Sequence, residues 1–169
     1  MERQRDIIDQ LRSAADDTLD LFASLTPQEQ QRSVYTEEVQ WTARRVLAHL
    51  VTIEQSMQAL FRDILAGGPG SPEHFDVMRF NRSQPQRLDP LSMPELLDRF
   101  QAVREETIAI VEAMQDADLD REGRHVFLGP GRLERFIRWA YEHARLHEED
   151  VRRALAGKRQ RERSNGPSG

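Results

Sequence analysis

Three of the five histidines in this chain occupy positions where a buried apolar side chain is expected. His143 and His147 are one helical turn apart in a segment with helical periodicity, so both project from one helix face with Cβ atoms roughly 5–6 Å apart. His49 lies on the apolar stripe of another predicted helix. Two imidazoles at this spacing can bind one metal ion, and a third from a facing helix would leave at least one coordination position open.

Three neutral nitrogen ligands favour a divalent transition metal over Ca²⁺ or Mg²⁺. We expect Zn²⁺ or Ni²⁺ first, with Co²⁺ and Fe²⁺ also suited to such a site. An open position is typical of catalytic rather than structural metal sites. Ala144 follows His143, whereas a His-Glu-x-x-His metalloprotease needs a glutamate there as its general base. The sequence therefore argues against a peptidase of that type.

The same histidines have a plainer interpretation as hydrogen-bonded core residues. Burying three imidazoles without partners would cost about 1–3 kcal/mol per unsatisfied group, a difficulty that a shared cation removes. His74 and His125 fall in predicted loops, and we interpret both as surface or pocket-rim residues. The acidic run at residues 148–150 is interpreted as a solvated face, although one of its members could hold a ligand histidine in place.

Four segments with helical periodicity would position these histidines. They cover roughly residues 2–24, 42–66, 92–115 and 132–156. Thr42 has the character of a helix N-cap, and the spacing of capping boxes recurs at Thr26 and Ser92. Residues 67–91 form a connection too long for a simple turn, with a short helix expected over residues 75–82. The pattern predicts an all-α, four-helix bundle with a long crossover between its second and third helices.

The remaining segments are expected to be irregular. Residues 116–131 are predicted to be a loop, with a short extended piece at 125–128 and a turn at 129–131. We predict one domain over residues 1–157 and a disordered, basic and polar tail over residues 158–169. That tail has a second interpretation as a contact for RNA or acidic lipid.

Composition narrows the classes of function. The 169 residues include 38% hydrophobic, 31% charged and 7% aromatic residues, which suits a helical rather than an all-β protein. The net charge of -5 is spread along the chain without a basic field, so nucleic acid is not expected as a partner. No signal peptide or apolar run of the ~18 residues needed for a membrane span is found. We expect a cytoplasmic protein without a membrane partner.

Four pieces of the sequence, in this order and spacing, resemble the DinB-like superfamily. They are residues 41–50 with Glu54 after them, residues 75–82 with the Asn81-Arg82 pair, residues 119–131, and residues 141–147 with the closing His-x3-His. The resemblance implies an up-down-down-up bundle, often a homodimer, with a three-histidine divalent site carried over onto His49, His143 and His147. It also suggests that Trp41, Asn81 and Arg82 line a cofactor pocket, although a helix staple and an ordinary loop pair explain them equally well.

The DinB-like superfamily, which this chain resembles, includes transferases and isomerases that use low-molecular-weight thiols. The resemblance therefore implies a metal-dependent enzyme that transfers such a thiol to a small electrophilic substrate, or a related hydrolase. The chain has no cysteine, so a thiol nucleophile would have to come from the cofactor. The alternatives are a non-catalytic metal-binding module, for instance in stress response, and a bundle whose histidines bind no metal.

Overall fold

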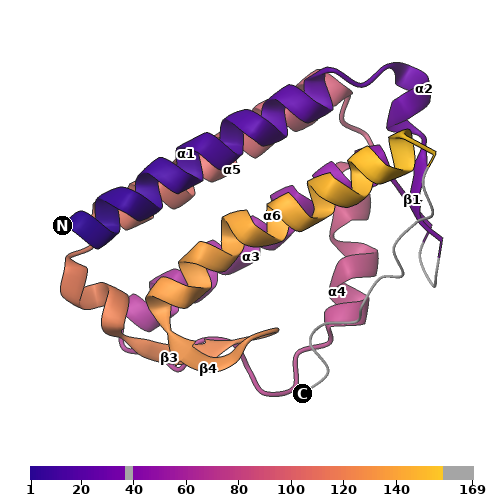
Figure 1. Cartoon of the computed structure of the whole chain (residues 1–169). Coiled ribbons are helices and arrows are strands. Elements are labelled where there is room, and N and C mark those ends of the chain that lie inside the picture. The colour runs from indigo at the N-terminus through magenta and orange to yellow at the C-terminus, as the bar shows by residue number, and fades with distance from the viewer. Residues whose placement is uncertain (37–39, 158–169) are drawn as a thin grey trace.

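The computed structural model describes residues 1–36 and 40–157, and the predicted tail lies outside the described residues. Its framework is a bundle of four long helices (Figure 1), which confirms the predicted fold class. These helices are α1 (Glu2–Ala23), α3 (Ala43–Leu65), α5 (Met93–Glu112) and α6 (Leu133–Leu155). In the described part of the chain, no helix has the length and apolar character needed to cross a membrane.

The helices follow the expected up-down-down-up order. Helices α1 and α3 each pack against both α5 and α6, so α1 and α3 occupy opposite corners of the bundle. Helix α6 therefore runs alongside α3 (Figure 1), which allows side chains from these two helices to meet. Each helix buries one apolar stripe, and the buried side chains form two adjoining clusters along the bundle.

Local sequence signals set the ends of these helices. The Thr42 hydroxyl accepts a hydrogen bond from the Arg45 N–H at 3.2 Å and begins α3 as predicted. Gly67 follows α3 with φ of 87°, a conformation that favours glycine. Both expected capping boxes form, at Ser92 before α5 and at Thr26 before the short helix α2 (Pro27–Gln30).

The crossover between α3 and α5 contains the predicted short helix. It includes α4 (Val77–Ser83), close to the expected residues 75–82, followed by the 3-10 helix η1 (Pro85–Leu88). The Arg44 guanidinium donates a hydrogen bond to the Leu88 carbonyl at 3.0 Å, which attaches η1 to the first turn of α3. The crossover is thus an ordered segment held against the bundle.

The prediction for residues 116–131, a loop with a short extended piece at 125–128 and a turn at 129–131, was wrong in its elements and their places. This segment forms the 3-10 helix η2 (Asp116–Asp120) and an antiparallel hairpin of β3 (Glu122–His125) and β4 (Gly129–Arg132). The residues assigned to a turn belong to β4, and the turn instead covers residues 126–128. A Cβ on Gly123 would lie 2.5 Å from the Ile64 side chain, so the close packing against α3 favours glycine here. Glycine is uncommon inside strands, and the local sequence therefore did not indicate β3.

A second small sheet was also absent from the sequence prediction. Strands β1 (Ser33–Tyr35) and β2 (Trp41–Thr42) pair antiparallel immediately before α3. Tyr35 and Trp41 are both buried, with 4% and 0% of their surface exposed. The short sheet therefore holds two aromatic side chains against the ends of α3 and α6.

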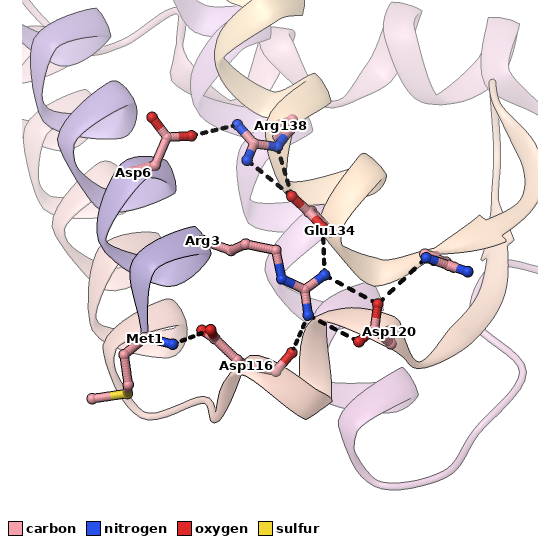
Figure 2. A network of polar contacts seen from close by, with 8 residues as sticks. Met1, Arg3, Asp6, Asp116, Asp120, Glu134 and Arg138 are labelled. Atoms are coloured by element: carbon pink, nitrogen blue, oxygen red, sulfur yellow. Dashed lines mark hydrogen bonds and ion pairs between the residues drawn. The ribbon is translucent and has the colours of Figure 1, made fainter.

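A polar network attaches the first turn of α1 to η2 and to the start of α6 (Figure 2). The Arg3 guanidinium binds Asp120 at 2.9 Å and Glu134 at 2.9 Å. These contacts lower the pKa of the Asp120 carboxyl and raise that of Arg3. Arg138 continues the network from Glu134 to Asp6 on α1. The network fixes the segment that leads into the β3–β4 hairpin.

The centre of the bundle contains a buried ion pair. The Arg104 guanidinium of α5 donates two hydrogen bonds to the Glu54 carboxylate of α3, at 2.7 and 2.9 Å. A third hydrogen bond reaches the Leu11 carbonyl of α1 at 3.0 Å. Arg104 is 1% exposed and Glu54 is 2% exposed, so the pair links three helices away from water.

Candidate metal centre

The structure brings together the three histidines singled out from the sequence. His49 comes from the second turn of α3. His143 and His147 come from one face of α6, one helical turn apart. One ring nitrogen from each histidine can be chosen so that all three lie within 4.8 Å of one another. His49 is 1% exposed and His147 is 8% exposed, whereas His143 is half-buried. The site therefore lies inside the bundle with access on the His143 side.

The spacing of the ring nitrogens fits a shared ion. Nε2 of His143 and Nε2 of His147 are 2.9 Å apart. Metal–nitrogen bonds of about 2.0–2.1 Å place two neighbouring ligand nitrogens roughly 3–3.4 Å apart. A small outward movement of the two rings would reach that range. The number, chemistry and convergence of the imidazoles thus suit a divalent transition metal better than Ca²⁺ or Mg²⁺.

A tyrosine that sequence reasoning missed orients one of these rings. The Tyr35 hydroxyl donates a hydrogen bond to the Asp150 carboxylate at 2.7 Å and lies 2.8 Å from Nδ1 of His147. Because the tyrosine proton is directed to Asp150, its oxygen is placed to accept from Nδ1–H of His147. That tautomer leaves the lone pair of Nε2 facing the other histidines.

The acidic run after His147 is not the solvated face that was predicted. Asp150 is 8% exposed and takes part in the tyrosine contact, and Glu148 is 1% exposed. Glu148 instead accepts a hydrogen bond from the Thr18 hydroxyl of α1. Burial raises the pKa of the Glu148 carboxyl, and the Thr18 hydrogen bond opposes that rise. Of the three acidic residues, Glu149 alone is exposed.

Two tryptophans flank the histidines. The Trp41 ring of β2 lies 4.7 Å from the His49 ring, between centroids. The Trp139 ring stacks on His143 at 4.2 Å with an interplanar angle of 18°. Trp139 was also missed, although its place one helical turn before His143 on the same face of α6 could have revealed it. Tyr35 gave no such signal, since 112 residues separate it from His147.

The remaining candidate residues lie in different surroundings. Asn81 is buried on α4 and Arg82 is exposed there, so their assignment to a cofactor pocket remains a prediction. His74 is exposed, as expected for a surface position. His125 is 3% exposed, so of its two predicted positions, at the surface or at a pocket rim, the structure excludes the surface one. It ends strand β3 and lines a pocket.

That pocket adjoins the histidine cluster. It lies between α3, the α4 segment and the β3–β4 turn, with about 320 Å³ of empty space that is partly open to solvent. Ile53 and Met57 of its wall follow His49 by one and two turns of α3. On the opposite wall, Phe127 stacks on Trp139 at 5.2 Å, and Trp139 in turn stacks on His143. The lining residues are Ile53, Ser56, Met57, Leu60, Ser71, Phe75, Val77, Phe80, His125, Val126 and Phe127.

Several solved structures share this fold at low sequence identity. YfiT from Bacillus subtilis, described as "a probable metal-dependent hydrolase with an unusual four-helix bundle topology", superposes with a TM-score of 0.75 at 15% identity, over 94% of this chain and 90% of that protein. The sibling lethal factor precursor DfsB has a TM-score of 0.73 at 16% identity, over 94% and 98% of the two chains. No curated protein matches the chain in sequence.

A third similar structure bears on the expectation that nucleic acid is not a partner. The colibactin self-resistance protein ClbS, solved in complex with a double-stranded DNA, has a TM-score of 0.70 at 12% identity, over 90% and 94% of the two chains. At such identity the likeness concerns the fold alone, so the expectation for this chain remains a prediction.

The sequence itself matches one family model along most of its length. The model of the DinB superfamily covers residues 10–151, which include all three clustered histidines and the four long helices in large part. This match confirms the resemblance drawn from the shorter motifs. The chain belongs to the DinB superfamily.

Proposed function

We propose that this protein is a metal-dependent enzyme whose ion is held by His49, His143 and His147 and whose substrates are small electrophiles. The convergence of three imidazole nitrogens within 4.8 Å is the observation that carries the proposal. We further propose Zn²⁺ or Ni²⁺ as the ion, because three nitrogen ligands favour these metals. When bound, the ion lowers the pKa of a thiol or water molecule at its open position.

The surrounding side chains support this chemistry. Tyr35 holds His147 in the tautomer whose Nε2 lone pair faces the other two rings. Trp41 and Trp139 cover His49 and His143 with apolar surface, which limits the access of bulk water. The half-buried His143 and the adjoining pocket leave one side open to a small molecule.

The proposed reaction is the transfer of a low-molecular-weight thiol. With an epoxide as substrate, the thiol sulfur forms a bond to a ring carbon, the carbon–oxygen bond breaks, and the released oxygen takes the thiol proton. The thiol comes from a cofactor such as mycothiol, bacillithiol or glutathione, since the chain contains no cysteine. A related hydrolysis, with water in place of the thiol, is the second candidate and is favoured by the likeness to YfiT.

The test compares protein loaded with Zn²⁺ or Ni²⁺ against the same protein stripped of metal. Each preparation is mixed with one of the three thiols and styrene oxide as a model electrophile, and mass spectrometry follows the thioether and diol products. Thioether formation that requires metal and is lost in His143→Ala supports transfer, whereas diol formation supports hydrolysis. Metal binding without either product would overturn the enzymatic proposal and favour a non-catalytic metal-binding module.

Two further expectations accompany this function. We propose a homodimer, as the resemblance implies, and sedimentation analysis of the full chain would test it. A cytoplasmic location also remains a prediction from the sequence.

A further inference from the structure

We propose that the pocket beside the histidine cluster binds the apolar body of an uncharged substrate, and that His125 donates a hydrogen bond there to a carbonyl oxygen. This assignment of a substrate class rests on the proposed function. It adds a specificity-determining residue that lies outside the three-histidine set. Its basis is the tautomer of His125, the character of the pocket wall and the position of the pocket.

The backbone of the β3–β4 turn determines the tautomer of His125. Nδ1 of this ring accepts hydrogen bonds from the N–H of Phe127 at 3.1 Å and from the N–H of Leu128 at 3.3 Å. A nitrogen that accepts from two amides carries no proton, so the proton of the neutral ring is on Nε2. Among the described residues, no side chain or carbonyl accepts a hydrogen bond from this Nε2–H.

The surroundings of His125 keep the ring uncharged. Burial lowers its pKa to about 4, and the positive charge of Arg135 acts in the same direction. The ring lies 4.6 Å from Trp139 and 5.2 Å from Phe136, between centroids, so apolar surface covers its faces. At neutral pH it therefore presents a neutral donor on the pocket wall.

The pocket wall selects against charged ligands. Its other side chains are apolar apart from two serines, and none of the described residues that line it carries a formal charge. A carboxylate or ammonium group placed there would lose hydration without gaining a countercharge. The roughly 320 Å³ of space at the pocket includes open solvent at its mouth, so a ligand held there would be only partly enclosed. The fitting ligand class is a small apolar molecule with a carbonyl acceptor.

The position of the pocket links this ligand to the metal centre. The same Trp139 ring contacts His125 on the pocket side and His143 on the metal side. Ile53 and Met57 continue the face of α3 that carries His49. A molecule held at His125 would thus lie beside the proposed reaction centre, with the Trp139 ring between the two.

The test uses two probes that differ in one group. Acetophenone has an aromatic ring and a carbonyl, and ethylbenzene has a methylene in its place. Binding to the full chain, stripped of metal, is followed by shifts in ¹H–¹⁵N spectra. We expect acetophenone to bind about fivefold more tightly than ethylbenzene, as one added hydrogen bond would give. Equal affinities would overturn the proposal.

The matched variant is His125→Asn. Its amide oxygen can still accept from the turn amides, but it has no donor at the position of Nε2. Acetophenone affinity should fall to that of ethylbenzene, whose own affinity should change less than twofold. Retention of the preference for acetophenone would refute the role of His125.

A measurement on the unaltered protein guards against a variant that fails to fold. Long-range ¹H–¹⁵N correlations of the His125 ring should show a bare Nδ1 and a protonated Nε2, and the reverse tautomer would overturn the proposal. Metal content is measured separately in the wild type and in His125→Asn. If the wild-type protein binds no metal but still prefers acetophenone to ethylbenzene, the proposed enzymatic function is refuted, whereas the proposed ligand pocket is not.

Discussion

The Tyr35 hydroxyl lies 2.8 Å from Nδ1 of His147 and donates a hydrogen bond to the Asp150 carboxylate. This relationship converts a histidine that could adopt either tautomer into one whose Nε2 lone pair faces His143 and His49. A buried histidine whose unprotonated nitrogen faces two other imidazoles is arranged for ligation. The contact therefore supports the proposed metal site over the interpretation of the three histidines as core residues.

Removal of the tyrosine hydroxyl should weaken metal binding without unfolding the bundle. In Tyr35→Phe, His147 loses the acceptor that orients its ring, and metal affinity should fall about 10–100-fold, as for other residues that support a ligand. Competition with a chromophoric chelator measures this affinity. Tyr141→Phe is the matched control, because its hydroxyl contacts Arg138 and does not face the histidines. Equal affinities for the two variants would show that Tyr35 has no orienting role.

The buried pair of Glu54 and Arg104 should matter far more to stability than a surface pair. Glu54→Gln leaves the guanidinium without its charged partner and should lower the free energy of unfolding by about 3–5 kcal/mol. Arg62→Met, which breaks the exposed pair with Glu106, should cost less than about 1 kcal/mol. Urea unfolding of each variant gives both values. A loss below 1 kcal/mol for Glu54→Gln would contradict the structural role assigned to the pair.

His125 should make the protein less stable as the pH falls. Its pKa is lowered from 6.5 to about 4, so the unfolded chain takes up the proton first and the stabilisation present above pH 6.5 is lost on approach to pH 4. The loss is up to about 3 kcal/mol, from the size of the shift. Urea unfolding of metal-free wild type and His125→Asn across this range isolates the effect, since the other histidines are common to both. Parallel curves would contradict the buried, uncharged state of this ring.

The chain should not bind double-stranded DNA at physiological ionic strength, despite its structural likeness to ClbS. Its net charge is -5, and the cations are interleaved with acids along the sequence. Non-specific DNA binding depends on a concentration of Lys and Arg that neutralises phosphates. Fluorescence anisotropy of a labelled duplex in about 150 mM salt tests this expectation, since binding weakens steeply with salt. Micromolar affinity for the duplex at that salt concentration would contradict the expectation drawn from the charge pattern.

The sequence predicts the helices and the histidine cluster well because both depend on local periodicity. His143 and His147 share a helix face at a fixed spacing, and His49 lies on a stripe whose burial the apolar pattern indicates. The starts of α3 and α5 followed from Thr42 and Ser92, whose capping contacts are formed within three residues. These parts of the structure are encoded in short windows of sequence.

The parts that were missed depend on contacts between distant segments. Tyr35 reaches His147 only when β1 is packed against α6, and no local pattern indicates that meeting. Glu148 is buried against Thr18 of another helix, a contact that its place in an acidic run does not indicate. The β3–β4 hairpin contains glycines where strands usually have branched side chains, because Gly123 must fit against Ile64. Pairing and close packing outweigh local propensity in each case.

Metal analysis of the untagged protein, purified without added ions, tests the central claim most directly. We predict about one divalent transition-metal ion per chain, because three imidazoles meet at a single site. We also predict its loss in His143→Ala and His147→Ala, while both variants still fold. The contrary result is wild-type protein that contains no ion and whose melting temperature is unchanged by added Zn²⁺ or Ni²⁺.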